Sequence, residues 1–467
     1  MIPTEVFLSS LENCEGFSKE NFVEAHLENA VVSVRANGVK LRYTSNSTDK
    51  ALLSSETGIF SNQNLFGKIP WCNDAYYLNE RPIFTLDPHI HAGVYYVQEA
   101  SSMFIHHALN QVLQDQRGLK ALDLCASPGG KTTLLASLPQ FRLVLANEII
   151  QSRVPALYEN VVKWGASHVF ISNNDPKDLE KLGGMFDLVL VDAPCSGSGL
   201  FRKDEEAANS WTSDLVNFCS LRQRRIISDS LKVLCENGIM VYSTCSFSAE
   251  ENESNLDFMV SAFDVESVPI DIHPEWGVVE SLSKEKKAHG YRFYPDKLKG
   301  EGFFCAILRK KSGAVLSVPE PKFPKGKSFG QIHAVKKWVS PDIELGYFSH
   351  EKDVFAFDLI NLVELTLFQE HLNLRKSGVR IGTMMRDEII PDHELAMSTI
   401  YSKELTTVNV NVKQAISYLR KENMLLDVAV KGWVLITFND IPLGWIKSLP
   451  GRINNYYPMN WRISMRK

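Results

Sequence analysis

Cysteine is scarce in this sequence, and its spacing is irregular. Eight cysteines are spread over 467 residues, and no two of them stand in a C-x-x-C pair. So few, scattered cysteines exclude a disulfide scaffold, and the paired spacing of a structural zinc site is missing. We therefore expect reduced thiols and no metal centre.

Long apolar runs and a strong excess of charge are also missing. No run approaches the roughly twenty apolar residues of a membrane span, and residues 1–10 lack the basic start and apolar core of a secretion signal. The formal net charge of −5 argues against a protein that coats nucleic acid non-specifically. With 44% hydrophobic and 22% charged residues, the composition predicts a globular, cytoplasmic protein without a membrane partner.

The length of the chain predicts roughly two to four domains. Residues 1–75 are expected to form a small α+β domain, with helices at 5–11 and 22–27, a strand at 30–35 and a turn at Asn37-Gly38. A loop rich in Ser, Asn and Thr is expected at 44–64.

A regular pattern begins at Leu119. Apolar runs rich in β-forming residues alternate with stretches able to form helices, at 121–125, 142–147, 168–172, 186–192 and 238–244. This alternation predicts a doubly wound, Rossmann-like α/β domain with a parallel sheet over residues 76–311. The longest helix is expected at 215–235, with its C-terminal signal at Asn237-Gly238, and a last strand at 302–309 is expected to form a hairpin with 263–270.

The turn after the first of these strands has the composition of a cofactor loop. Small residues in Cys125, Ala126, Ser127, Pro128, Gly129, Gly130 and Lys131 would let a ligand approach the backbone at the start of a helix. The loop is neither the dinucleotide G-x-G-x-x-G nor a phosphate-binding P-loop. Glu148, at the end of the next strand, can accept both hydroxyls of a ribose. A nucleoside cofactor with little or no phosphate fits best, and S-adenosylmethionine is the common one.

Two acidic residues near this loop have open roles. Asp175, near the end of the third strand, is either a cofactor contact or the N-cap of a helix that starts at Pro176, and both roles are compatible. Asp123 is expected to orient the loop or to reach the methionine part of the cofactor.

Two cysteines stand apart from the other six. Cys195 and Cys245 follow predicted strands and have polar neighbours, which suits a reactive thiol more than a packed one. Arg202 and Lys203 could supply the positive setting that a thiolate needs. The chemistry that joins a thiolate to S-adenosylmethionine is methylation of a pyrimidine carbon, since attack at C6 makes C5 nucleophilic. Asp192 is placed to hydrogen-bond the N3/N4 edge of cytosine. These residues alone leave open which cysteine attacks.

Five stretches, in this order, resemble the bacterial RNA cytosine-5 methyltransferases of the Nop2/Sun family, and within it the small-subunit rRNA methyltransferase F group. They are 95–102, 123–132, 192–197, Thr244-Cys245-Ser246 with 250–253, and 300–304. The resemblance implies that Cys245 is the nucleophile and that Cys195 assists release of the enzyme. It also implies that Cys125 to Lys131, Glu148, Asp175 and Asp192 contact S-adenosylmethionine. One departure is Ser172-Asn173-Asn174 before Asp175, where relatives carry a Phe-Asp-Gly-like form.

The last third of the chain changes in composition. Residues 312–380 are expected to be a lysine-rich linker or intermediate region, or a strap that follows RNA. Residues 381–467 resemble the PUA-like RNA-binding module of the same group, with a hairpin across Asn439-Asp440. From Lys447 onward, basic residues alternate with Tyr456, Tyr457 and Trp461, which suits either RNA contacts or a small core.

The resemblance implies a monomeric rRNA cytosine-C5 methyltransferase that acts on 16S rRNA or the small ribosomal subunit. Two alternatives remain at this point. The first is a methyltransferase for tRNA, another nucleobase or a protein, for which both thiols would be dispensable. The second is a catalytically silent RNA-binding assembly factor, for which an intact cofactor loop and two cysteines would serve no purpose.

Overall fold

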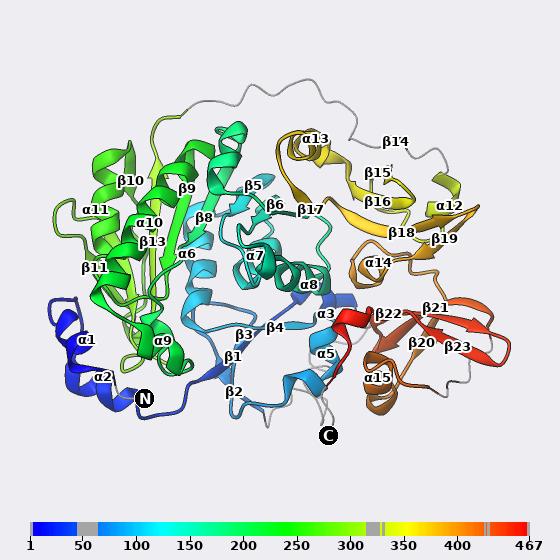
Figure 1. Cartoon of the computed structure of the whole chain (residues 1–467), viewed down its shortest axis with the longest axis horizontal. Coiled ribbons are helices and arrows are strands. Elements are labelled where there is room, and N and C mark those ends of the chain that lie inside the picture. Colours follow the sequence, from blue (N-terminus) through cyan, green and yellow to red (C-terminus); the bar gives the residue numbers. More distant parts are fainter. Residues whose placement is uncertain are drawn as a thin grey trace.

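The computed structural model describes residues 3–43, 64–313, 327–328, 332–424, 426 and 430–464 (Figure 1). Within these residues the strands form four sheets, the largest with ten strands. The large sheet and its helices lie on one side of the molecule, and the two last sheets lie on the other (Figure 1). None of the helices in the described ranges is both long enough and apolar enough to cross a membrane.

The first sheet, of order β2-β3-β1-β4, is antiparallel around its central strand β1. It does not stop at the expected domain boundary of residue 75, because β3 begins there and β4 continues the sheet to Val97. At Asn37-Gly38 the chain starts a helix rather than a turn, and the loop expected at 44–64 falls on residues 44–63, outside the described residues. The strands are Val32–Ala36 (β1), Leu65–Lys68 (β2), Ala75–Leu78 (β3) and Tyr95–Val97 (β4), and the helices are Glu5–Ser10 (α1), Lys19–Ala25 (α2), Gly38–Tyr43 (α3), Phe84–Leu86 (η1) and Pro88–His91 (α5).

The ten-stranded sheet confirms the predicted doubly wound fold. Its order is β11-β12-β13-β9-β8-β5-β6-β7-β17, with β10 paired to β13. The five central strands are parallel, and the two strands that flank them, β13 and β17, are antiparallel to their neighbours β9 and β7. The strands are Leu119–Asp123 (β5), Phe141–Asn147 (β6), Val169–Ser172 (β7), Phe186–Asp192 (β8), Leu234–Thr244 (β9), Val265–Ser267 (β10), Val279–Leu282 (β11), His289–Phe293 (β12), Phe303–Lys310 (β13) and Leu374–Lys376 (β17).

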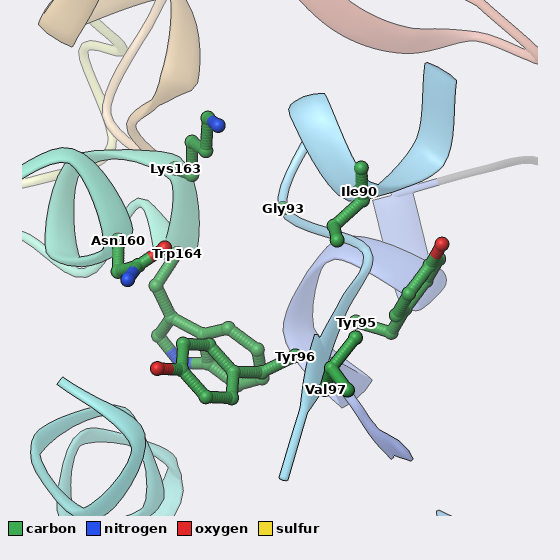
Figure 2. A pocket seen from close by; sticks show the side chains of 8 residues that line it. All are labelled: Ile90, Gly93, Tyr95, Tyr96, Val97, Asn160, Lys163 and Trp164. Carbon is green, nitrogen blue, oxygen red and sulfur yellow. The ribbon is translucent and has the colours of Figure 1, made fainter. Parts of the chain in front are cut away.

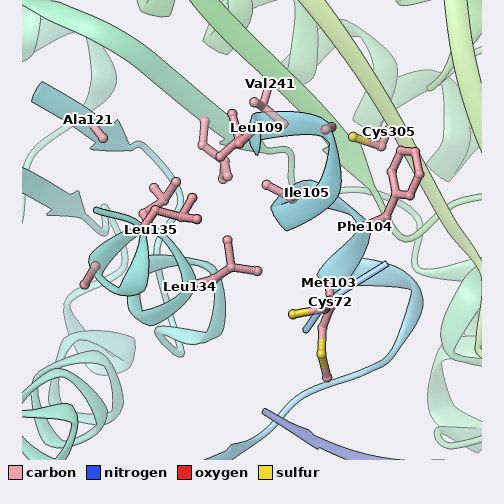
Figure 3. Packing of buried hydrophobic residues seen from close by; sticks show 14 of the residues in the cluster. Cys72, Met103, Phe104, Ile105, Leu109, Ala121, Leu134, Leu135, Val241 and Cys305 are labelled. Atoms are coloured by element: carbon pink, nitrogen blue, oxygen red, sulfur yellow. The ribbon is translucent and has the colours of Figure 1, made fainter. Parts of the chain in front are cut away.

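Helices cover both faces of this sheet and bury its apolar side chains. One core lies between the sheet and α6, α7 and α8; Figure 3 shows Ile105 and Leu109 of α6 on one side and Leu134 and Leu135 of α7 on the other. The second core lies under α10, α11, α13 and η4. These helices are Phe104–Leu113 (α6), Gly130–Ser137 (α7), Val154–Trp164 (α8), Pro176–Leu182 (η4), Ser213–Val233 (α10), Glu253–Ala262 (α11) and Leu362–His371 (α13). The short helices described in this region are Ser101–Met103 (η2), Gln151–Arg153 (η3), Ser198–Leu200 (η5), Glu205–Ser210 (α9) and Pro274–Trp276 (η6).

Two local predictions in this sheet need correction. The long helix ends at Val233 and passes directly into β9, so Asn237-Gly238 lies within that strand, where Asn237 has a positive φ of 60°. The residues expected to form a hairpin with β13 do pair with it through β10, but the β11–β12 hairpin lies between them in the sequence. Asn237 therefore marks an irregularity within β9, where the register with β8 shifts, and not the end of the helix.

The region expected to be a linker contains its own sheet. Of residues 312–380, those that the structure describes form α12, β15, β16, α13 and β17, and β18 runs across the expected boundary at 380/381 without interruption. Lys322 and Lys325 of the proposed strap lie outside the described residues. Buried and partly exposed positions alternate along most of β15 and β16, because one face of the sheet packs against a core. The elements are Lys327–Ser328 (β14), Ile332–Lys336 (α12), Leu345–His350 (β15), Asp353–Asp358 (β16), Leu359–Asn361 (η7), Val379–Met385 (β18), Glu388–Pro391 (β19) and His393–Met397 (α14).

The C-terminal sheet confirms the predicted hairpin. Strands β21 and β22 are joined by Asn439 and Asp440, whose φ angles of 49° and 62° are those of a tight turn that favours Asn and Asp. The sheet shares a core with the N-terminal sheet, in which Val34 and Tyr95 join Val434 and Leu443. Its elements are Thr407–Asn409 (β20), Val412–Leu419 (α15), Gly432–Phe438 (β21), Ile441–Leu449 (β22), Arg452–Asn455 (β23) and Met459–Trp461 (η8).

Candidate active site

The sheet brings the predicted site residues to one edge. The parallel strands β5, β6, β7, β8 and β9 end at Asp123, Asn147, Ser172, Asp192 and Thr244, so the loops that follow them lie on the same side. From β5 the chain continues to β6 and β7 on one side, and it then crosses back to form β8 and β9 on the other side of β5. The crevice at such a reversal is where open α/β sheets bind their ligands.

The loop after β5 ends at the start of helix α7. Gly129 caps this helix with a φ of 108°, a conformation that favours glycine, and exposes the amide groups of the first turn to a ligand. Asp123, at the end of β5, is fully buried; its Oδ2 accepts a hydrogen bond of 2.6 Å from Thr132 Oγ1, and its Oδ1 has no partner among the described atoms. Burial raises the pKa of this carboxyl to about 7. Burial also raises the pKa of Cys125, which is therefore an unreactive thiol.

The two other expected cofactor carboxylates have different surroundings. Glu148 is buried and accepts backbone N–H groups of Ile150 at 2.8 Å and Ser127 at 3.3 Å, which ties the ends of β5 and β6 together. Asp175 caps η4 through Lys177 N at 3.0 Å and forms a two-pronged ion pair with Arg225. Burial raises the pKa of Asp175, but these bonds outweigh it and lower the pKa overall. Asp175 therefore fulfils the N-cap role and remains a carboxylate.

A cavity of about 210 Å³ lies beside the cofactor loop, between α8 and β4 (Figure 2). The rings of Tyr96 and Trp164 lie together at its wall, and Asn160 donates a hydrogen bond of 2.8 Å to Pro128 O of the loop. Lys163 bonds to Glu159 and lies 5.7 Å from the ring centroid of Trp461 in the C-terminal module. The residues that line the cavity come from two stretches, 90–97 and 160–164, and the Asn160 bond connects α8 to the loop after β5.

The two singled-out cysteines meet. Cys195 Sγ lies 3.1 Å from Cys245 Sγ, and both thiols are free. The hydrogen bond between them, together with burial, raises the pKa of Cys195 well above its ordinary value. Cys195 therefore keeps its proton at neutral pH, and its S–H group can donate to the sulfur of Cys245.

The loops that carry these thiols are bonded to each other. Gly199 N donates to Cys245 O at 2.8 Å, and Phe247 N donates to Ser198 Oγ at 2.9 Å. A side chain at position 199 would come within 2.4 Å of Gly302 O, so the close approach of the loops requires glycine there. Ser198 and Gly199 both belong to the short helix Ser198–Leu200 (η5).

Asp192 lies between the thiols and the cofactor loop. Its Oδ2 is 2.7 Å from Lys131 Nζ, and its Oδ1 accepts a hydrogen bond of 2.9 Å from Ser243 Oγ. A carboxylate offers about four acceptor positions, so each oxygen can still accept a further hydrogen bond.

The expected role of Arg202 and Lys203 is not supported. Arg202 is 3.7 Å from one oxygen of Glu301 and Lys203 is 3.7 Å from the other, so both cations pair with this carboxylate. The raised pKa of Cys195 agrees with this, because a nearby uncompensated cation would lower it.

Sequence reasoning missed Glu251. It is fully buried and bonds to the residues that follow both cysteines. The acidic run 250–253 was part of the matching pattern, but the sequence alone did not distinguish the one buried carboxylate in it from its neighbours. Only its packing against both loops does so.

Family comparisons cover most of the chain. Residues 110–309 match the family described as 16S rRNA methyltransferase RsmB/F. Residues 2–100 match the N-terminal domain of 16S rRNA methyltransferase RsmF, and residues 406–463 match the methyltransferase RsmF PUA domain.

Whole-length relatives agree with these matches. Ribosomal RNA small subunit methyltransferase F of Shewanella sp. strain MR-4 is 30% identical over 94% of this chain and 93% of the relative. The protein of the same name from Shewanella oneidensis is 29% identical over the same shares, and that from Escherichia coli is 29% identical over 84% of this chain and 83% of its own.

Solved structures share the fold. A methyltransferase homolog protein from Pyrococcus horikoshii is 28% identical and superposes with a TM-score of 0.51, covering 66% of this chain and 99% of its own. NSun6 from the same organism, crystallised with SFG, is 20% identical with a TM-score of 0.52, covers 66% of this chain and 97% of its own, and shows the fold alone. With a relative at 30% identity along nearly the whole length, the chain belongs to the family of 16S rRNA methyltransferases RsmB/F, whose cofactor is S-adenosylmethionine.

Proposed function

We propose that this protein methylates carbon 5 of a cytosine in small-subunit rRNA, with Cys245 as the nucleophile and Cys195 assisting release. The observation that carries the proposal is the pair of thiols 3.1 Å apart at the carboxyl edge of the sheet. Asp192 ends the strand that precedes Cys195 and pairs with Lys131 of the cofactor loop. The groups for binding the cofactor and for attacking the base thus share one crevice.

The loop after β5 fits S-adenosylmethionine. The partnerless, buried Oδ1 of Asp123 suits the ammonium of the methionine part, and the amides of α7 suit its carboxylate. Residues 125–131 would line the cofactor, Glu148 would accept hydrogen bonds from the ribose, and Asp175 would lie toward the adenine. When bound, the cofactor supplies an electrophilic methyl group on a sulfonium.

Cys245 is the better nucleophile of the two thiols. Because the pKa of Cys195 is raised, its S–H donates a hydrogen bond to Cys245 and stabilises a thiolate there. Addition of this thiolate to C6 of cytosine forms an S–C6 bond and shifts the C5=C6 electron pair onto C5. The cofactor, which residues 125–131 would hold, would supply the methyl group to C5, and its methyl–sulfur bond would break to leave S-adenosylhomocysteine.

Release requires two further bond changes. The proton on C5 leaves to a base, its electron pair restores C5=C6, and the S–C6 bond breaks to return Cys245 as a thiolate. Cys195 lies beside the sulfur that must leave, so its proton can support the departing charge.

Asp192 would hold the base during these steps. Its carboxylate has remaining acceptor positions for the N4 amino group and for a protonated N3, and this stabilises the ring as electrons accumulate on it. Every side chain invoked belongs to one chain, and we propose that the protein acts as a monomer.

Replacing each cysteine tests the proposal. Cys245→Ala should abolish methyl transfer to small-subunit rRNA while affinity for S-adenosylhomocysteine persists. Cys195→Ala should attack and then stall, so a protein–RNA adduct that survives denaturing gel electrophoresis should accumulate. Cys235→Ala, at the other end of β9, is the matched control and should leave turnover unchanged. Normal turnover by Cys245→Ala would overturn the proposal. Bisulfite sequencing of rRNA from cells with and without the gene would identify the modified base.

A further inference from the structure

A buried carboxylate lies behind the two cysteine loops. Glu251, in the turn before α11, has no exposed surface. Its Oε1 accepts hydrogen bonds from Ser196 N at 2.8 Å and Gln223 Nε2 at 3.1 Å. Its Oε2 accepts hydrogen bonds from Ser196 Oγ at 2.6 Å and Ser246 Oγ at 2.5 Å. Ser196 and Ser246 directly follow Cys195 and Cys245, so this one side chain binds both loops.

The surroundings of Glu251 fix its place. Tyr242 OH of β9 donates to Glu251 O at 2.5 Å, and Asn255 Nδ2 of α11 donates to the same oxygen at 3.2 Å. Asn255 Nδ2 also donates to Gln223 Oε1 at 2.8 Å. The amide oxygen of Gln223 is thereby oriented away from Glu251, and its NH₂ group is left to donate to the carboxylate. A strand and two helices therefore hold the position of this carboxylate.

Burying a carboxylate is unfavourable unless several donors compensate for the lost water. The four hydrogen bonds that Glu251 accepts compensate for its lost hydration. Three of them come from Ser196 and Ser246, the residues next to the cysteines. Its bonds set the path of the backbone at Ser196 and Ser246, and hence the direction from which each neighbouring thiol approaches the other.

We propose that Glu251 is a positioning residue for the methyl transfer, which holds the Cys195 and Cys245 loops in register so that the two thiols stay in contact. This inference rests on the proposed two-cysteine reaction. It assigns no contact with the base or the cofactor to Glu251, which acts through the serines.

Two substitutions separate positioning from charge. Glu251→Ala removes all four hydrogen bonds. Glu251→Gln keeps the length: its oxygen can accept from Ser196 N and Gln223, and its NH₂ group can donate to the hydroxyls, which rotate to accept. Glu250→Ala is the matched control, because that neighbouring carboxylate is exposed.

Three measurements apply to these variants. The first is affinity for S-adenosylhomocysteine, which reports an intact fold. The second is the rate of adduct formation with rRNA containing 5-fluorocytidine, in which the fluorine on C5 cannot leave as a proton does and the adduct is trapped. The third is the pH dependence of alkylation of Cys245 by iodoacetamide, which requires the thiolate.

We expect Glu251→Ala to bind S-adenosylhomocysteine as the wild type does and to form adduct about 100-fold more slowly, as a misplacement of about 1 Å would cause. The midpoint of Cys245 alkylation should move to higher pH, because the S–H group of Cys195 no longer reaches it. Glu251→Gln should restore the adduct rate to within about tenfold of the wild type. A purely structural role would not move the alkylation midpoint.

Adduct formation and alkylation by Glu251→Ala within twofold of the wild type would overturn the inference. If Glu251→Ala does not fold, the double variant Ser196→Ala/Ser246→Ala replaces it in the test. This variant keeps the carboxylate and its hydrogen bond from the backbone N–H of residue 196. An unchanged rate of adduct formation would overturn the inference, and a slower rate would support it. Normal turnover by Cys245→Ala would instead overturn the two-cysteine reaction. If Cys245→Ala does not methylate rRNA but Glu251→Ala forms the adduct at the wild-type rate, only the proposed role of Glu251 is overturned.

Discussion

Lys131 Nζ lies 2.7 Å from Asp192 Oδ2, and this ion pair joins the first turn of α7 to the end of β8. Burial lowers the pKa of Lys131, but the carboxylate of Asp192 outweighs this and raises it overall. Lys131 therefore carries a positive charge at neutral pH. The pair connects the loop proposed to bind the methyl donor with the residue proposed to hold the base.

Because Lys131 and Asp192 act as one pair, the rate loss caused by replacing both should be smaller than the product of the two single losses. Asp192→Asn is expected to slow single-turnover methyl transfer about 100-fold, as loss of a group that stabilises charge in a transition state does. Adding Lys131→Met should slow it by less than about threefold more, since the lysine acts on the rate through Asp192. The exposed pair Lys232–Glu180, at 3.2 Å, is the control, and its double substitution should change neither rate nor stability measurably. Full multiplication of the two losses would contradict a joint role.

The buried carboxyl of Asp123 predicts a pH-dependent stability. Its pKa is raised by burial from 3.8 to about 7, so the fold favours the protonated form. The stability that this group contributes is complete below pH 3.8 and is lost as the pH rises to about 7. Asp123→Asn cannot ionise at this position, so it serves as the reference. The free energy of unfolding of the wild type, minus that of the variant, should fall as the pH rises, by at most about 1.4 kcal/mol per pH unit. This difference should become constant above about pH 7. Urea unfolding of both proteins at pH 5, 6, 7 and 8 measures this, and a constant difference would contradict it.

The sequence predicted the elements whose patterns are local. Strand β8 begins and ends at the predicted residues, because its apolar run lies between polar ends on a strand buried on both faces. The Asn439-Asp440 hairpin was predictable because both residues tolerate positive φ. The edge on which the site residues meet followed from the alternation of strands and helices.

Contacts between distant segments were not predictable from these patterns. Nothing in the sequence near Arg202 indicates that Glu301 compensates its charge, and nothing near residue 374 indicates that β17 pairs with β7 of the large sheet. Asn237-Gly238 has the composition of a helix end, yet the chain had already left the helix because β9 pairs with β8 from Leu234 onward. Tertiary pairing overrode the local signal in each case.

Asp175 has two possible roles that one substitution can separate. Asp175→Ser keeps a side-chain oxygen that can cap η4, so the free energy of unfolding should change by less than about 0.5 kcal/mol. If Asp175 also accepts a hydrogen bond from the adenine, affinity for S-adenosylhomocysteine should fall about tenfold, the cost of one bond to a charged acceptor. Arg225→Ala removes the other partner of the carboxylate and should not weaken binding. Calorimetric titration measures both variants, and unchanged affinity in Asp175→Ser would leave Asp175 as a helix cap only.

The C-terminal sheet carries a surface that suits RNA. The Nζ of Lys447 lies 5.2 Å from the ring centroid of Trp433, and the ring of Tyr456 meets the same indole at 4.5 Å. Tyr456 is 37% exposed, whereas Tyr457 is 1% exposed and belongs to the core, so the two adjacent tyrosines have opposite roles. Exposed aromatic faces beside a cation bind unstacked bases and phosphates.

The double variant Trp433→Ala/Tyr456→Ala is expected to weaken binding of small-subunit rRNA at least about tenfold, because each stacked base contributes about 1–3 kcal/mol. Lys447→Ala should weaken it less and should reduce the dependence of the logarithm of affinity on the logarithm of salt concentration by about one unit. Affinity for S-adenosylhomocysteine should be unchanged in all three variants. Phe218→Ala, which removes an exposed ring (61%) from α10, is the control and should bind RNA normally. Filter binding at several salt concentrations measures these effects, and wild-type affinity in the double variant would place the RNA contact elsewhere on the protein.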